Sequence, residues 1–223
     1  MAAAAAVRGG ASATCWCGRA SLKFEHREPR AALECCCHDC TQKVAWSRRA
    51  QASEGGHRTP AVARLVYLEN RLSCTVVGGE LLEHRRLRDG AGSSFVAAMC
   101  CGAVLAVDNA FYFGNVVAVL QEACVLDCGP CRAAGRSHVA DYESRAEARP
   151  ELARFDGPPS RVFFGDARDD ASEKACYYAE LGFSRPPRSD ETGRPRTLTL
   201  QGLLRQLGIA DAHSLGLLEA API

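Results

Sequence analysis

Thirteen cysteines are the residues of this sequence best suited to chemistry, and most of them stand in short clusters. The count is several times what an ordinary globular chain needs. Disulfides, metal ligands and buried inert thiols are the three competing uses. Cysteines one or two residues apart pair poorly with each other, but they hold one ion well, because Zn²⁺ takes thiolate sulfurs about 2.3 Å away in a tetrahedron. The spacing therefore favours metal binding under reducing, intracellular conditions.

The most specific pattern is Cys35-x-Cys37-x-x-Cys40, which places three thiolates within six residues. Three ligands fit one ion whose fourth corner is either open to water or substrate, as in catalytic zinc sites, or supplied from elsewhere. A closed site would be completed by Cys36, by His38 or by a cysteine distant in the sequence. Cys36 adjoins two of the predicted ligands, so it cannot easily bind the same ion in the same turn.

A second pattern consists of two cysteine pairs far apart in the sequence, each followed by a glycine. The glycine lets the backbone turn tightly, so that amide N–H groups point at the sulfurs. Half-sites of this kind often meet to form a closed site with four ligands. The two half-sites here are Cys15-Trp16-Cys17-Gly18 and Cys100-Cys101-Gly102.

The late cysteines Cys124, Cys128 and Cys131 have no assigned partner. Cys128-Gly-Pro-Cys131 has the form of a thioredoxin-type redox pair, which would sit between a strand and a helix N-terminus. No βαβ pattern surrounds it, so a further metal ligand or a buried thiol suits the segment better. Cys74 and Cys176 are isolated and are predicted to be inert packing residues.

The elements that must position these cysteines are predicted to be mainly β-strands. Alternating, β-branched and aromatic residues favour strands, and Gly-rich turns separate them. A polar loop is expected at 47–60 and a hairpin over 65–77, with a strand–knuckle–strand unit around Cys100. The predicted strands lie at 20–25, 65–68, 72–77, 80–87, within 94–107 and within 111–120.

The chain changes character after about residue 131, where Arg, Ala, Asp and Pro become frequent. Asp170 with Glu173 resembles a capping box for a short helix through Tyr177 and Leu181. One apolar helical face is predicted over 200–207, ended by Gly208. A second short helix is expected around Leu215 and Leu218. These leucines are predicted to be packing faces.

Composition limits the remaining function classes. The chain has 223 residues, 47% of them apolar, with 27 basic against 26 acidic side chains. This balance argues against a nucleic-acid partner, and no apolar run is long enough to span a membrane. Residues 1–13 form an Ala-rich, flexible lead without the apolar core of a secretory signal, which favours the cytoplasm, with organelle import as the alternative.

The order of these motifs resembles the glutathione-dependent formaldehyde-activating enzyme and centromere protein V family. The resemblance covers roughly residues 14–120. The sequence departs from the family pattern at three places. Ala98 stands where the family usually has the first cysteine of its late CxxCG motif. Cys36 stands where His is frequent, and Thr41 and Gln42 follow Cys40, where Arg or Lys is usual. The motifs that carry the resemblance are Cys15-Trp16-Cys17-Gly18, Cys35-Cys36-Cys37-His38-Asp39-Cys40, Val77-Gly78-Gly79-Glu80-Leu81-Leu82 and Cys100-Cys101-Gly102-Ala103.

The resemblance implies an Mss4-like β-tent that holds two Zn²⁺ ions. One zinc would be structural, bound by Cys15, Cys17, Cys100 and Cys101, with the late cysteines as substitute donors. The other would be of catalytic type, bound by Cys35, Cys37 and Cys40. The domain arrangement expected is a lead at 1–13, the zinc-binding domain at 14–131 and a C-terminal extension with short helices at 132–223.

The implied activity is that of a carbon–sulfur lyase acting on a thiol–aldehyde adduct of the S-hydroxymethylglutathione type, formed from glutathione and formaldehyde. His38 is a candidate for proton transfer, and a plain surface position is the alternative for it. Two other functions stay open. One is a non-catalytic zinc module that binds a protein partner, through the C-terminal helix. The other is a thiol oxidoreductase that uses Cys128 and Cys131.

Overall fold

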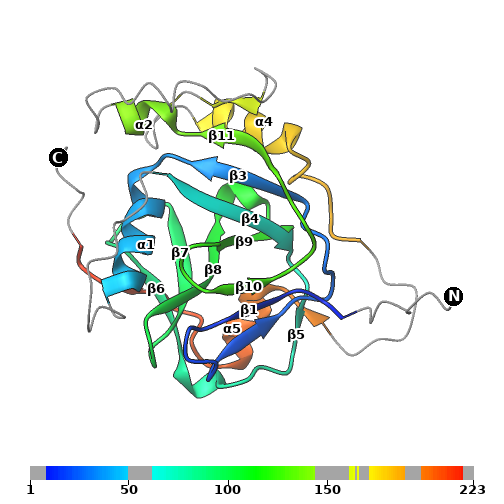
Figure 1. Cartoon of the computed structure of the whole chain (residues 1–223), viewed down its shortest axis with the longest axis vertical. Coiled ribbons are helices and arrows are strands. Elements are labelled where there is room, and N and C mark those ends of the chain that lie inside the picture. Colours follow the sequence, from blue (N-terminus) through cyan, green and yellow to red (C-terminus); the bar gives the residue numbers. More distant parts are fainter. Residues whose placement is uncertain are drawn as a thin grey trace, which may run out of the picture.

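An eight-stranded mixed sheet organises the molecule in the computed structural model (Figure 1). The structure describes residues 9–49, 62–143, 161–163, 165, 171–188 and 197–217. All neighbouring strands of this sheet are antiparallel except β11 with β3 and β13 with β6. In spatial order the strands are β11 (Ala133–Ser137), β3 (Ala31–Cys35), β4 (Ala63–Glu69), β9 (Val116–Leu120), β8 (Ala103–Asn109), β7 (Ser93–Ala98), β6 (Leu82–Arg86) and β13 (His213–Ser214).

Two smaller sheets and a few short helices complete the described part. The three-stranded sheet has β10 (Val125–Asp127), β1 (Ser12–Thr14) and β2 (Ser21–Lys23), and the two-stranded sheet has β12 (Thr197–Leu198) and β5 (Leu72–Ser73). The helices are α1 (His38–Arg49), α2 (Val139–Glu143), α4 (Ala171–Glu180) and α5 (Leu200–Gln206), with 3₁₀ turns η1 (Gly79–Leu81) and η2 (Ala110–Tyr112). The expectation of a mainly β protein is confirmed.

The large sheet separates two hydrophobic clusters, because successive side chains of a strand point to opposite faces. On β9, Val116, Ala118 and Leu120 face one cluster, whereas Val117 and Val119 face the other. The first cluster contains side chains of α1 and α4, and the second contains side chains of α5, β1 and β2. In Figure 1, α2 and α4 lie beside β11 at the top, and α5 lies near β1 at the bottom.

Several local predictions are confirmed. The unit around Cys100 is strand β7, a turn at 99–102 and strand β8. The helix at 200–206 buries its leucines, and Gly208 follows it with a left-handed φ of 73°. A helix also begins near the predicted capping box, since α4 starts at Ala171; Asp170 itself lies outside the described residues.

Other local predictions are wrong. Residues 47–49 end helix α1 instead of opening the predicted loop, whose remainder at 50–60 lies outside the described residues. Strands β4 and β5 do not pair as a hairpin: β4 pairs with β3 and β9, and β5 pairs with β12. The second C-terminal helix is absent from the described residues, where 213–214 form the edge strand β13; Leu218 is not described.

The division at residue 131 stays a prediction. Strand β11, which follows that point, lies in parallel beside β3 and carries Ser137 opposite Cys35. The chain after residue 131 thus contributes a strand to the large sheet and, through α5, part of the second hydrophobic cluster. Among the described residues, no helix is both long and apolar enough to cross a lipid bilayer.

Candidate metal centres

Two groups of cysteines come together in the structure, and they are the two groups expected from the sequence. We call Cys15, Cys17, Cys100 and Cys101 cluster one, and Cys35, Cys37 and Cys40 cluster two. Within each group all sulfurs lie within 4.8 Å of one another. Cys15 packs in the hydrophobic cluster of α5, whereas cluster two packs in that of α1, so the groups belong to opposite faces of the large sheet.

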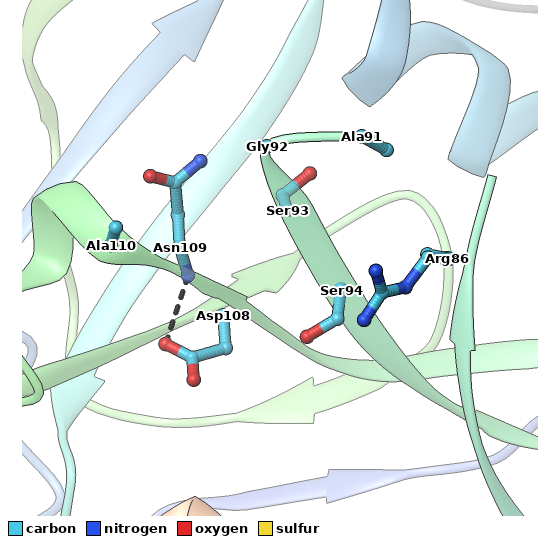
Figure 2. Close-up of a pocket in the computed structure, with 8 residues that line it drawn as sticks. All are labelled: Arg86, Ala91, Gly92, Ser93, Ser94, Asp108, Asn109 and Ala110. Atoms are coloured by element: carbon cyan, nitrogen blue, oxygen red, sulfur yellow. Dashed lines mark hydrogen bonds between the residues drawn. The ribbon is translucent and has the colours of Figure 1, made fainter. Parts of the chain in front are cut away.

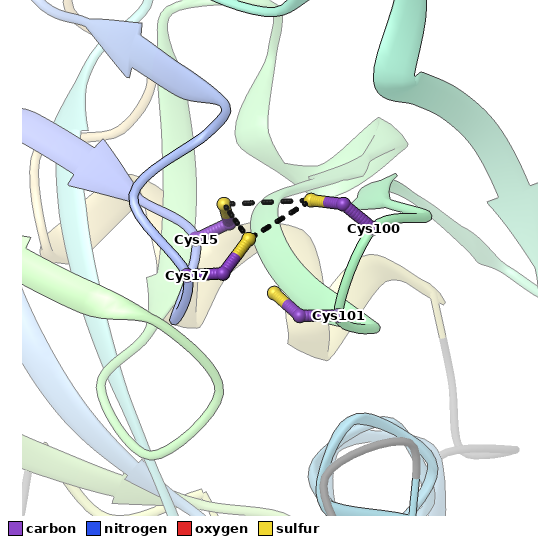
Figure 3. Close-up of side chains that lie close together, drawn as sticks. All are labelled: Cys15, Cys17, Cys100 and Cys101. Carbon is purple, nitrogen blue, oxygen red and sulfur yellow. Dashed lines mark hydrogen bonds between the residues drawn. The ribbon is translucent and has the colours of Figure 1, made fainter.

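Cluster one joins the loop after β1 to the turn between β7 and β8. Figure 3 shows its four sulfurs pointing toward one another from these two segments. The Sγ–Sγ distances are 3.5 Å for Cys15–Cys17, 3.6 Å for Cys15–Cys100 and 3.4 Å for Cys17–Cys100. Adjacent Cys100 and Cys101 therefore both reach the group, although the family resemblance suggests a wider spacing between the two.

Tight turns that end in glycine create this geometry. The Gly18 N–H donates to the Cys15 carbonyl at 2.9 Å, and the Gly102 N–H donates to the Ala98 carbonyl at 2.8 Å. Both glycines have left-handed φ angles, 75° and 70°, which a residue with a Cβ rarely adopts. The Ala20 N–H donates to the Cys15 sulfur at 3.2 Å, as expected for an amide that orients a metal-binding thiolate.

The thiols of cluster one have unequal pKa values. Hydrogen bonding with the Arg19 backbone, followed by hydrogen bonding with Cys100, lowers the pKa of Cys17 to about 7. Desolvation, followed by the bond to Cys17, raises the pKa of Cys100 to about 12. Cys17 is therefore more easily deprotonated than Cys100. A cation bound here would take the place of the thiol protons.

Cluster two lies where β3 ends and α1 begins. Cys35 is the last residue of β3, Cys37 is in the connection, and Cys40 is in the first turn of α1. The Cys35 and Cys37 sulfurs are 3.2 Å apart, and the Cys40 N–H donates to the Cys37 sulfur at 3.4 Å. The three side chains are only 1%, 7% and 7% exposed, so the ion would be largely shielded from water.

The three thiols of cluster two have shifted pKa values, and only that of Cys35 is lowered. Hydrogen bonding with Cys37 and then with Cys40 holds the pKa of Cys35 well below its usual value. The same Cys35 interaction raises the pKa of Cys37 to about 11 and that of Cys40 well above its usual value. The positive end of the α1 dipole also favours anionic sulfur at this position. Cys35 is therefore the thiol of cluster two that loses its proton most readily.

His138 is the neighbour of cluster two that sequence reasoning missed. Its Nδ1 lies 3.7 Å from the Cys35 sulfur. The two residues are 103 positions apart, and only the parallel pairing of β11 with β3 brings them together. No local spacing signals this contact. His38 and Cys36, which the sequence offered as completing ligands, are not members of either group within 4.8 Å.

The late cysteines belong to neither cluster. Desolvation is the largest cause of the raised pKa of Cys124, about 12, and of the raised pKa values of Cys128 and Cys131. A redox-active CxxC pair needs the opposite, a thiol whose pKa is lowered by a helix N-terminus. The pair is instead followed by strand β11.

A pocket of about 170 Å³ opens at another place on the large sheet, beside the ends of β6, β7 and β8. Figure 2 shows the Arg86 side chain directed toward Ser94 there, with Asp108 beside it. Asp108 Oδ1 accepts a hydrogen bond from the Asn109 N–H at 2.9 Å. The lining holds no cysteine: it consists of Arg86, Ala91, Gly92, Ser93, Ser94, Asp108, Asn109 and Ala110.

The sulfur geometry fits zinc. Four sulfurs placed about 2.3 Å from one ion at tetrahedral angles lie about 3.8 Å apart. The observed separations of 3.2–3.6 Å are slightly shorter than this, and far longer than the S–S bond of about 2.05 Å in a disulfide. All thirteen cysteines are free thiols. Either cluster could therefore hold one metal ion, which is compatible with two sites per chain.

A comparison with models of known protein families and with curated proteins finds no match to this sequence. The resemblance to the formaldehyde-activating enzyme family therefore rests on the sequence motifs alone.

Proposed function

We propose that the chain is a zinc protein of the β-tent type, with a structural ion in cluster one and a catalytic-type ion in cluster two. The observation that carries this proposal is the assembly of two separate, disulfide-free sulfur groups on opposite faces of one sheet. Cluster one has four donors and would be a closed site. Cluster two has three cysteine donors, which leaves one corner for another ligand.

We further propose that cluster two supports a carbon–sulfur lyase reaction on a thiol–aldehyde adduct, with glutathione and formaldehyde as the probe pair. In the forward direction the thiol sulfur bonds to the carbonyl carbon, and the thiol proton ends on the oxygen of the S-hydroxymethyl product. Zinc would stabilise the incoming thiol as a thiolate. Cys35, Cys37 and Cys40 would hold that ion at the N-terminus of α1.

Phenol groups near cluster two suit the oxygen of such an adduct. Burial, together with the nearby sulfurs of cluster two, raises the pKa of Tyr112 well above its usual value. The Tyr112 hydroxyl therefore keeps its proton at neutral pH and can donate a hydrogen bond to an oxygen that gains charge. Burial likewise raises the pKa of Tyr67 well above its usual value, and the Tyr67 ring packs edge-on against that of Tyr112, with centroids 5.2 Å apart.

The alternative functions have less support. The leucines of α5 are buried against the large sheet, with Leu200, Leu203 and Leu204 each 1% exposed, so that face offers no surface to a protein partner. The raised pKa values of Cys128 and Cys131 disfavour a nucleophilic thiolate, and hence a thiol oxidoreductase.

Metal content and turnover together test the proposal. The purified chain should contain two zinc ions, Cys37→Ser should contain one, and the control Cys176→Ser should keep two, because Cys176 is exposed and outside both clusters. ¹³C NMR of labelled formaldehyde with glutathione should show accelerated exchange with the S-hydroxymethyl adduct for wild type and Cys176→Ser only. Two bound zinc ions without acceleration over a panel of thiols would refute the lyase activity and leave the metal sites standing.

A further inference from the structure

A fourth candidate metal ligand lies close to cluster two, outside the cysteine motif. Strand β11 runs parallel to β3 with Ser137 opposite Cys35. The Cys36 N–H donates to the Ser137 carbonyl at 2.9 Å, which extends this pairing one residue beyond the strands. His138 is the residue that directly follows β11. The two parallel strands therefore deliver Cys37 and His138 to the same edge of the sheet.

The position of the His138 ring suits a metal ligand. Its Nδ1 lies 3.7 Å from the Cys35 sulfur. In a tetrahedral site with Zn–S about 2.3 Å and Zn–N about 2.05 Å, a sulfur and a nitrogen ligand lie about 3.6 Å apart. The ring is 8% exposed and packs edge-on against Phe163, with ring centroids 5.4 Å apart. Its only hydrogen-bond partner among the described residues is this sulfur, which is a weak acceptor.

The backbone at His138 is also unusual. Its φ is 58°, one of two left-handed values found for non-glycine residues in the described part of the chain. Such a conformation is uncommon for a side chain with a Cβ, and it persists where the surrounding structure fixes it. Here it turns the chain between β11 and α2 and directs the imidazole to cluster two.

We propose that His138 supplies the fourth ligand of cluster two, which makes the resting site a closed Cys₃His centre. This inference rests on the proposal that cluster two holds zinc. The sulfurs and a ring nitrogen do not all lie within 4.8 Å of one another, so metal binding must be accompanied by a rotation of the imidazole. A thiol substrate would then have to displace the imidazole to reach the ion, and His138 would control access to the site.

Coupling between ¹¹³Cd and ¹⁵N nuclei tests this assignment directly. The full chain, labelled with ¹⁵N-histidine and loaded with ¹¹³Cd²⁺, should bind two ions and show one imidazole nitrogen with a one-bond coupling to cadmium. His138→Gln should abolish the coupling and weaken cadmium binding at cluster two roughly 10- to 100-fold. His84→Gln is the matched control, because His84 is also buried but its Nδ1 donates to the Ala210 carbonyl, 2.9 Å away.

Each other outcome is equally decisive. Two bound ions without any coupling would overturn the role of His138 and leave the metal proposal intact, whereas a single bound ion with cluster two empty would overturn both. Coupling that survives in His138→Gln but disappears in His38→Gln would identify His38 as the fourth ligand of cluster two instead. Should His138→Gln fail to fold, nuclear Overhauser effects between the coupled imidazole and the Phe163 ring would identify His138 in the wild type.

Discussion

Individual side chains near cluster two divide into those that would hold the ion and those that would serve the substrate. Cys35 carries the lowest pKa of its group and Tyr112 a raised one, and both shifts follow from burial and from the charges and hydrogen bonds of the same small region. In the addition of sulfur to a carbonyl group, the thiolate would bind the cation and the phenol would donate a hydrogen bond to the oxygen.

Replacement of Tyr112 by Phe tests the second of these roles. The ring stays and keeps its edge-on contact with Tyr67, at 5.2 Å between centroids, so folding and zinc content should be unchanged. Loss of one hydrogen-bond donor to the reacting oxygen should lower kcat/KM about 100-fold in the glutathione and formaldehyde exchange assay.

Tyr177→Phe is the control for Tyr112→Phe. The Tyr177 hydroxyl lies 3.1 Å from the Arg136 carbonyl and 3.0 Å from the Arg161 carbonyl, so its removal should affect stability and leave kcat/KM nearly unchanged. Equal kcat/KM values for wild type and Tyr112→Phe would exclude Tyr112 from the reaction.

His84 predicts a pH effect on stability that is independent of catalysis. Burial lowers its pKa below the usual 6.5, and its Nδ1 is 2.9 Å from the Ala210 carbonyl. The unfolded chain therefore binds a proton at His84 more readily than the folded chain does. The contribution of His84 to the free energy of unfolding is complete above about pH 6.5, and it is lost as the pH falls through the lower, folded-state pKa.

Urea unfolding of wild type and His84→Gln at pH 7.5 and 5.5 measures this effect. The wild type should lose more of its free energy of unfolding on acidification than the variant, whose side chain does not titrate. Acid release of metal affects both proteins alike, so the comparison isolates His84. An equal loss in the two proteins would contradict the assignment.

At the scale of elements, the glycine turns are what allow cluster one to form. Gly18 and Gly90 share nearly the same left-handed φ, 75° and 74°, and a Cβ at either would meet no atom within 4 Å. Alanine at either position therefore has the same conformational cost of about 1–2 kcal/mol and no steric one. Of these two glycines, only Gly18 adjoins a cysteine of cluster one.

We therefore expect Gly18→Ala and Gly90→Ala to be destabilised by similar amounts but to differ in metal binding. Competition with a chromophoric chelator should show weaker zinc binding at cluster one for Gly18→Ala, because the strained turn moves the Cys17 sulfur. Gly90→Ala should bind both ions as the wild type does. Matched zinc affinities in the two variants would mean that the turn does not determine the geometry of cluster one.

The elements also show which features of the fold and the candidate sites can be predicted from local sequence patterns. Short cysteine spacings identified both clusters, and the Leu200 helix was visible from its apolar period, because these signals are local. The start of α1 was missed because the cysteine motif that occupies its first turn hides any apolar period. The contact of His138 with Cys35 depends on the parallel pairing of β11 with β3, which no local pattern encodes.

At the scale of the molecule, described segments after residue 180 are held to one end of β4 by ion pairs and hydrogen bonds. Glu69 ends that strand and is 1% exposed in its side chain. The Arg30 Nε lies 3.3 Å and the Arg188 Nε 2.9 Å from its Oε1. The adjacent Asn70 accepts a hydrogen bond from the Leu200 N–H at 2.6 Å, which fixes the start of α5.

Removal of the Glu69 charge should therefore loosen the C-terminal segments. In Glu69→Gln two guanidinium groups lose their shared carboxylate, and breaking a buried ion pair in this way costs about 3 kcal/mol or more. The free energy of unfolding should fall accordingly, and hydrogen exchange should speed up in 182–188 and in α5. Asp127→Asn removes the exposed pair with Arg27 and should change stability far less. Because Cys35 of cluster two lies at the opposite end of β3, where it pairs with Ala63, Glu69→Gln should still bind two zinc ions. A variant that unfolds near the wild-type midpoint, or that loses a zinc ion, would show that β4 and the C-terminal segments are coupled in some other way.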